Sequence, residues 1–128
     1  MNFSESELTV LELLWDGECL DENGEIMASN LSNILTEKYG WSKSSNYTFI
    51  SRLLEKGAIT RRYPKYTLKP VVTREEVGTA QTEEVLNNVF NGSLINLVSA
   101  FMTEKKVSKK ELEEMKDLIN SFDIEEKY

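Results

Sequence analysis

The side chains in this chain that could do chemistry are hydroxyl, amide and guanidinium groups gathered between residues 41 and 72. Such groups can exchange hydrogen bonds with the edges of DNA bases, and cations beside them can bind phosphates. The predicted base-facing residues share one polar helix face: Ser44, Ser45, Tyr47, Thr48 and Arg52. The predicted phosphate-binding residues flank that face: Ser42, Lys43, Arg61, Arg62 and Lys65. Polar faces are also ordinary on solvated helices, so this helix by itself does not establish DNA binding.

A helix must present these groups, and residues 41–59 carry the signals of one. Ser42 is a suitable N-cap, and Gly57 is a suitable terminator. Between them the apolar residues recur at helical spacing: Phe49, Ile50, Leu53 and Leu54. Residues 58–72 then read as two β-rich runs around a tight basic turn at residues 63–65. A helix followed by a basic hairpin predicts a winged helix-turn-helix, and this order favours DNA binding.

The charge distribution supports a phosphate partner although the net charge is −7. Residues 37–72 hold eight basic and two acidic side chains, a local charge of +6. Residues 1–25 hold eight acids and no Lys or Arg, and residues 73–128 hold twelve acids and seven bases. A protein that needs phosphates on one face and solubility elsewhere would be charged in this way. Chance clustering in an acidic protein is the alternative.

The segments before residue 41 complete the predicted DNA-binding domain, residues 1–72. Ser4 and Glu7 form a capping box directly before an apolar-periodic run. The predicted elements are, in order, a helix at 5–15, an exposed acidic loop at 16–24, a minor third strand at 26–27 and a helix at 28–39. The short turn at residues 38–42 then provides the helix-turn-helix step.

Residues 73–128 change in character and are predicted to form a helical dimerisation domain, so the fold class is mainly α (α+β). The predicted elements are helices at 74–90, at 93–103 and from 108 onward, with a frayed tail at 123–128. Three such helices are too small to bury their own apolar faces. We expect a second copy of the chain to cover them, through Val85, Val89, Phe90, Leu94, Leu97, Val98, Phe101, Leu112, Met115 and Ile119. Packing onto the first helix within a monomer is the alternative.

Several classes of function lack the residues they need. No apolar run approaches 18 residues and no signal peptide is visible, so we expect a cytoplasmic protein without membrane insertion. The chain has one cysteine, Cys19, and no histidine. We therefore expect no metal and no cofactor. No catalytic constellation can be named, so we do not expect an enzyme.

Four motifs occur in the same order as in a known family. They are Ser4…Glu7…Val10…Leu14-Trp15, then Trp41-Ser42…Thr48…Arg52-Leu53…Lys56-Gly57-Ala58-Ile59, then Val72-Thr73-Arg74-Glu75-Glu76, and finally Phe90-Asn91-Gly92-Ser93-Leu94 with Leu97, Val98, Phe101, Val107, Ser108, Glu111, Leu112 and Leu118. Together they resemble the penicillinase repressor (BlaI/MecI/CopY) family of transcriptional regulators. The resemblance spans nearly the whole chain.

The resemblance implies a dimeric winged-helix repressor that binds an interrupted palindrome in promoters. In the best-known branches, a membrane-embedded sensor protease leads to cleavage within the dimerisation segment. The corresponding bond in this chain would join Ala100 and Phe101. Copper-sensing members instead carry C-terminal Cys-x-Cys motifs, which this chain lacks, so copper sensing is disfavoured.

This chain departs from the family's pattern near the predicted site. The acidic loop at residues 16–23 is longer than the family's, and the wing around residues 63–65 is shorter. Ser44, Ser45 and Tyr47 stand where the family often has Lys and Thr, and Asn46 replaces an apolar residue. The operator sequence therefore cannot be transferred from the family.

The function predicted from the sequence is a dimeric transcriptional repressor that binds a pseudo-palindromic double-stranded DNA operator through its winged helix. The alternative is a winged-helix protein–protein interaction module, or a co-regulator, with weak or no DNA binding. The acidic balance and the few long cations on the helix favour that alternative.

Overall fold

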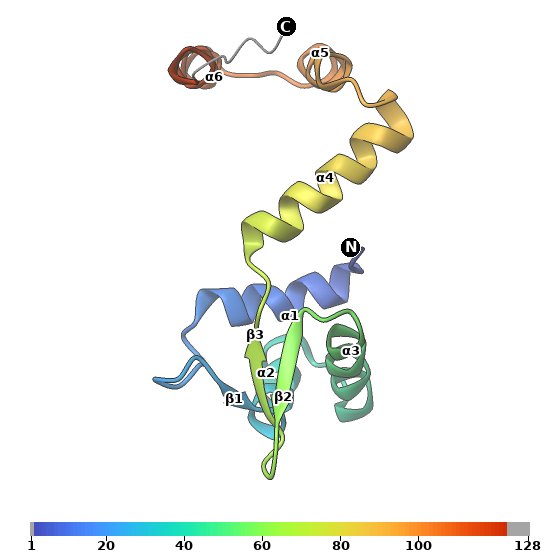
Figure 1. Cartoon of the computed structure of the whole chain (residues 1–128), viewed down its shortest axis with the longest axis vertical. Helices are drawn as coiled ribbons and strands as arrows, with labels where there is room; N and C mark the ends of the chain where they lie inside the picture. Colours follow the sequence, from blue (N-terminus) through green and yellow to red (C-terminus); the bar gives the residue numbers. More distant parts are fainter. Residues whose placement is uncertain (1, 123–128) are drawn as a thin grey trace, which may run out of the picture. The chain divides into compact units, whose positions relative to one another are not determined.

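A computed structural model describes residues 2–122 of the chain (Figure 1). The chain folds into two compact units, one ending at Glu84 and the other beginning at Val85. The predicted frayed tail at residues 123–128 lies outside the described residues.

The first unit contains three helices, a three-stranded sheet and the start of a fourth helix. Its elements are α1 (Glu5–Asp16), β1 (Ile26–Met27), α2 (Ala28–Tyr39), α3 (Lys43–Glu55), β2 (Ile59–Arg62), β3 (Thr67–Pro70) and α4 (Arg74–Phe90). The antiparallel strands have the order β1-β3-β2, with Leu68 of β3 opposite both Ile26 and Arg61. The predicted helix-turn-helix, hairpin wing and minor third strand are confirmed.

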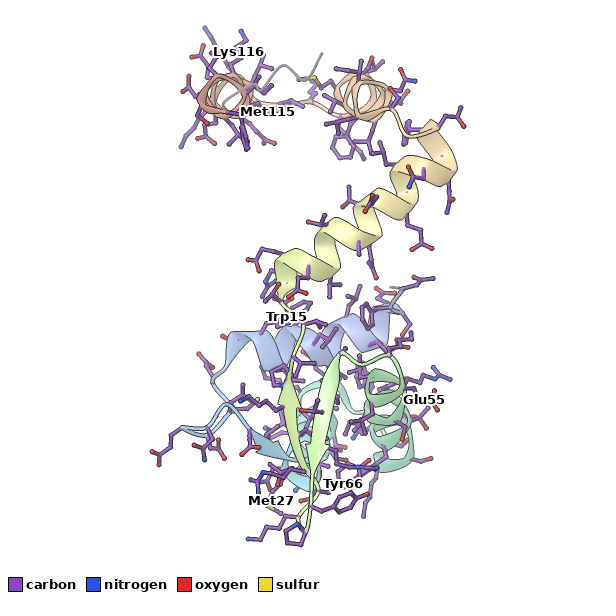
Figure 2. All side chains as sticks on the ribbon, viewed as in Figure 1. Trp15, Met27, Glu55, Tyr66, Met115 and Lys116 are labelled. Carbon is purple, nitrogen blue, oxygen red and sulfur yellow. The ribbon has the colours of Figure 1, made fainter. Side chains whose placement is uncertain are left out.

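The apolar periodicity that predicted the helices also forms the core of this unit. Helix α3 packs against both α1 and α2, and each of the three helices contacts the sheet (Figures 1 and 2). The largest fully buried apolar side chains are Val10, Leu11, Leu14, Leu31, Leu35, Ile50, Leu53, Ile59 and Leu68. Because α3 buries Ile50 and Leu53 against the other elements, its opposite polar face is held outward in a defined orientation.

One carboxylate belongs to this core. Glu7 is only 2% exposed and forms an ion pair with Lys56, which follows α3. The Ser4 hydroxyl also donates to Glu7, at 2.9 Å, and accepts from the Glu7 backbone N–H at 3.2 Å. Burial by itself would raise the pKa of Glu7, but the hydrogen bonds from Lys56 and Ser4 outweigh it and hold the pKa below the ordinary value of 4.5.

This buried carboxylate predicts a specific acid sensitivity. Because the pKa of Glu7 is lower in the folded protein than in the unfolded chain, ionised Glu7 stabilises the fold above pH 4.5. This stabilisation is lost as the pH falls through the pKa that Glu7 has in the folded protein. Glu7→Gln should cost about 1–3 kcal/mol of unfolding free energy at pH 7, because a charge-assisted hydrogen bond is lost. Urea unfolding of both proteins at pH 7 and pH 3 checks this: the gap between them should narrow at pH 3. Parallel pH profiles would assign the acid sensitivity to other carboxylates.

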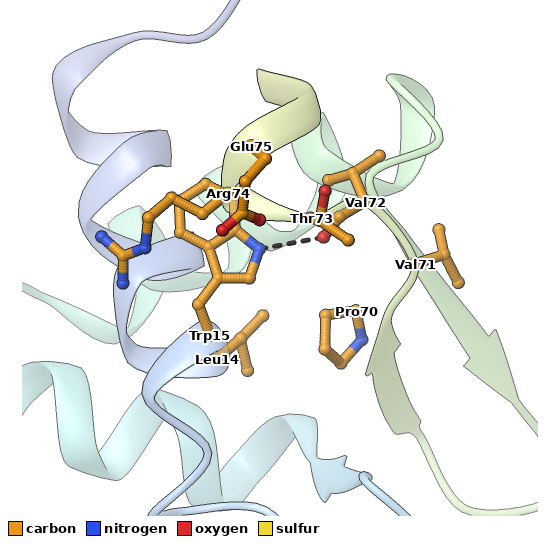
Figure 3. Close-up of a pocket in the computed structure, with 8 residues that line it drawn as sticks. All are labelled: Leu14, Trp15, Pro70, Val71, Val72, Thr73, Arg74 and Glu75. Atoms are coloured by element: carbon orange, nitrogen blue, oxygen red, sulfur yellow. Dashed lines mark hydrogen bonds between the residues drawn. The ribbon is translucent and has the colours of Figure 1, made fainter. Parts of the chain in front are cut away.

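The junction between β3 and α4 is fastened to α1. The Trp15 indole N–H donates to the Val72 carbonyl at 2.9 Å, and both residues line a hollow of about 390 Å³ (Figure 3). Thr73 and Glu76 form the predicted capping box at the start of α4. Farther along α4, Val77 is buried and the Gln81 side-chain carbonyl accepts from the Phe3 N–H at 3.0 Å. These contacts make the first part of α4 belong to the first compact unit, which ends at Glu84.

The second unit contains the end of α4 and two further helices, α5 (Leu94–Glu104) and α6 (Lys109–Ser121). Ser93 and Ser108 cap α5 and α6 by accepting from the N–H groups of Asn96 and Glu111. No side chain between residues 85 and 122 is fully buried, and Phe101 is 61% exposed. These helices are formed but lack a core within one chain.

The helices are short or polar by the standard of a membrane span. Within residues 2–122, no single helix is both long and apolar enough to cross a bilayer. Only the sharply bent pair of α4 and α5 reaches that length and hydropathy when the two helices are taken together.

Candidate nucleic-acid interface

The outer face of α3 carries an exposed stripe of three polar residues. Ser44, Thr48 and Arg52 are exposed and spaced four residues apart, so they lie on one side of the helix. The Thr48 hydroxyl donates to the Ser44 carbonyl at 3.0 Å, which leaves its oxygen free to accept. This stripe can offer a base edge a hydroxyl, a hydroxyl acceptor with a methyl group, and a guanidinium.

At the start of α3, Ser42 and Ser45 are hydrogen-bonded to each other. The Ser42 oxygen accepts from the Ser45 backbone N–H at 3.1 Å, as predicted for an N-cap, and its hydroxyl donates to the Ser45 hydroxyl at 3.0 Å. Ser45 is half-buried rather than exposed, and its hydroxyl keeps one donor for another group. Lys43 beside them is exposed.

Tyr47 joins α3 to the wing. It is half-buried, and its ring meets the Tyr66 ring edge-on with centroids 6.3 Å apart. The Tyr66 hydroxyl accepts from Arg61 at 3.2 Å, and the Arg61 guanidinium lies 5.0 Å from the ring centres of both Tyr63 and Tyr66. Tyr66, which the sequence did not single out, therefore holds α3 and the cationic wing together. It lies at the wing end of the sheet, near Met27 (Figure 2).

The three predicted phosphate-binding residues of the wing have different surroundings. Arg61 and Lys65 are exposed, and within the described residues neither has a carboxylate at salt-bridge distance. Arg62 instead forms two hydrogen bonds with Glu25, of 3.0 and 3.1 Å. The cationic charge available at the wing is thus smaller than the sequence count suggests.

A buried amide fixes the angle between α2 and α3. Asn46 is fully buried, and the two hydrogens of its amide nitrogen are shared among three acceptors: the Ser32 carbonyl at 2.9 Å, the Ser32 hydroxyl at 3.1 Å and the Thr36 hydroxyl at 2.9 Å. The Thr36 hydroxyl in turn donates to the Trp41 carbonyl in the turn, at 2.7 Å. This network positions α3 relative to α2 and the turn. A polar residue on the helical phase of Ile50 and Leu53 was the sequence signal for it.

The predicted dimer and cleavage residues lie in the helices of the second unit. Those that are exposed in a single chain are Val85, Val89, Leu94, Phe101 and Ile119. Those that are half-buried are Phe90, Leu97, Val98, Leu112, Met115 and Ala100 of the predicted cleavage bond.

A helix-turn-helix with an antiparallel wing, polar side chains along its second helix and exposed cations on the wing defines a winged-helix protein of the DNA-binding kind. The penicillinase repressor family matches residues 3–121. The chain therefore belongs to the penicillinase repressor family. It is a winged-helix transcriptional repressor and not an enzyme.

Individual relatives agree with this assignment. The chain is 24% identical over 119 residues to the methicillin resistance regulatory protein MecI of Staphylococcus aureus, covering 91% of this chain and 92% of that protein. It is 25% identical over 118 residues to the penicillinase repressor of Bacillus licheniformis, covering 91% and 88%. The solution structure of the DNA-binding domain of the repressor BlaI matches with a TM-score of 0.50 and 21% identity, over 59% of this chain and 87% of that one. This last likeness confirms the predicted fold.

Proposed function

We propose that this repressor acts as a homodimer on a pseudo-palindromic DNA operator. Each α3 enters a major groove with Ser44, Thr48 and Arg52 toward the bases, and each wing places Arg61 and Lys65 on the phosphates. The observation that carries this proposal is the exposed polar stripe on α3 beside a wing with two cations that have no carboxylate partner among the described residues. Ser42, Lys43 and Ser45 lie at the start of α3, where backbone and hydroxyl donors meet a phosphate or the first base.

The second unit supports the dimeric form. Val89, Phe101 and Ile119 are 66%, 61% and 65% exposed in a single chain. Exposed apolar side chains on three consecutive helices require a partner surface, and an identical chain supplies one with closed two-fold symmetry. A dimer would separate its two recognition helices by about one duplex turn, roughly 34 Å, which matches an operator of two half-sites.

Release from DNA would follow from damage to this dimer. We propose an inducer system, such as a sensor protease, that cleaves between Ala100 and Phe101 within α5. A cut there would divide α5 and separate the apolar residues that are proposed to form one dimer surface. We further propose that the protein acts in the cytoplasm, where its operator lies.

Two variants test the assigned roles. Thr48→Ala should reduce discrimination at one base pair of the operator by about 1–3 kcal/mol, because it removes a base contact. Arg61→Gln should weaken binding to all sequences and flatten the slope of log K against log salt by about 0.9 per lost phosphate contact. Fluorescence anisotropy with operator and mismatched duplexes over a salt series distinguishes the two effects. Identical behaviour of both variants would contradict the role assignment.

Site selection from random duplex DNA tests the function as a whole. Recovery of an inverted repeat supports the proposal. If the purified protein binds no duplex at low salt, the alternative of a winged-helix protein–protein interaction module replaces it.

A further inference from the structure

One of the two wing arginines forms an ion pair with a carboxylate. Arg62 is the last residue of β2, and Glu25 directly precedes β1 at the other edge of the sheet. The Arg62 Nε and Nη2 atoms donate to the two Glu25 carboxylate oxygens at 3.1 and 3.0 Å. The Glu25 side chain is only 13% exposed, whereas that of Arg62 is 61% exposed. Arg62 therefore faces solvent while its charge is balanced by a more sheltered carboxylate.

A closed turn holds Glu25 in this position. The Asp21 carboxylate accepts from the backbone N–H groups of Asn23 and Glu25 at 2.9 and 3.0 Å. The Asp21 N–H donates to the Glu25 carbonyl at 2.8 Å, and Gly24 adopts a positive φ of 73° within the turn. This turn belongs to the acidic loop between α1 and β1. Glu25 is thus presented to the wing by a backbone that local hydrogen bonds hold in place.

Each of the paired groups favours the charged form of the other. The hydrogen bond from Arg62 lowers the pKa of Glu25, and the same bond raises the pKa of Arg62. A guanidinium binds a carboxylate and a phosphate through the same two-pronged geometry. A DNA phosphate that approaches Arg62 through its Nε edge must therefore displace Glu25.

We propose that Glu25 is an intramolecular competitor of DNA phosphate for Arg62, and that it lowers the affinity of the wing for DNA. This inference rests on the proposed DNA-binding function. While Glu25 neutralises Arg62, Arg62 does not neutralise a phosphate and releases no counterion from the DNA. Arg62 therefore adds little to DNA binding in the native protein. Removal of the Glu25 charge makes Arg62 a working phosphate contact.

The test measures the binding of full-length variants to a random duplex of about 30 base pairs over a salt series. Glu25→Gln should raise the affinity about five- to tenfold near 0.1 M monovalent salt and steepen the log K against log salt slope by about 0.9 per protomer, the effect of one added phosphate contact. Glu22→Gln is the matched control, because Glu22 is exposed in the same turn and is not in salt-bridge contact with Arg62. It removes the same charge and should leave the slope unchanged.

Arg62→Gln, alone and combined with Glu25→Gln, completes a double-mutant cycle. It should change the affinity by less than about twofold in the native background, and it should abolish the whole gain in the Glu25→Gln background. If Glu25→Gln and Glu22→Gln bind alike, or if Arg62→Gln alone weakens binding as strongly as Arg61→Gln, the competition is refuted while the DNA-binding function stands. If no protein in the series binds the duplex, both proposals fall. Thermal melting confirms that each variant is folded, and the single Arg62→Gln variant decides the matter if Glu25→Gln unfolds.

Discussion

Replacing Phe101 with aspartate should break the proposed dimer into 14.7 kDa monomers and lower the operator affinity by about 100-fold or more. Phe101 is 61% exposed on α5, on the same helix face as Leu94, Leu97 and Val98. In the proposed dimer this face is covered, so a charge there is buried without a partner. A monomer binds each operator half-site separately, so it loses the gain in affinity that two linked DNA-binding units have.

Asn96→Asp is the matched control for this variant. Asn96 lies on the opposite side of α5 and in its first turn, where an added negative charge suits the helix dipole. Sedimentation velocity at low micromolar concentration should show the dimer for Asn96→Asp and the monomer for Phe101→Asp. The winged unit should keep its melting transition in both, because Phe101 lies outside its core. A dimer that survives Phe101→Asp would place the interface elsewhere.

Replacing Asn46 with leucine should lower the unfolding free energy of the winged unit by about 2–4 kcal/mol. Leucine has nearly the shape of asparagine but cannot donate to Ser32 or Thr36, so their oxygens lose a buried donor. The angle between α2 and α3 also loses its polar restraint, and the operator should be bound less selectively. Urea unfolding and binding to operator and mismatched duplexes measure the two effects.

The triple variant Ser32→Ala, Thr36→Val and Asn46→Leu separates stability from positioning. The three side chains are then apolar, and only the Ser32 backbone carbonyl remains as a polar group at this contact. Replacement of a buried hydrogen-bonded set of side chains by apolar groups is often nearly neutral. Among the described residues, the Asn46 amide oxygen is buried without a hydrogen-bond partner, so its removal also removes a desolvation cost. We expect most of the stability to return while the selectivity stays low. Recovery of both properties would show that Asn46 has no positioning role.

Local rules were enough to predict the helices and the hairpin wing from the amino-acid sequence. These rules concern capping residues such as Ser42 and Ser108, a terminating glycine at Gly57, and apolar residues at a 3.6-residue period. The charge excess between residues 37 and 72 and the four family motifs are likewise readable without coordinates. They were sufficient to predict the winged-helix repressor family.

Which polar residues are available to meet DNA depends on contacts between distant parts of the chain. Arg62 is paired with Glu25 across the sheet, Tyr47 packs on Tyr66, and Asn46 is buried against α2. Each pairing joins residues 10 or more positions apart in the chain, so no local pattern reveals it. Helical periodicity says which face a residue occupies, but a hydrogen-bond partner or a packed ring depends on where the other elements lie. Which of the predicted DNA-contacting residues are exposed, and which are paired within the chain, could therefore be decided only once the sheet and helices were in place.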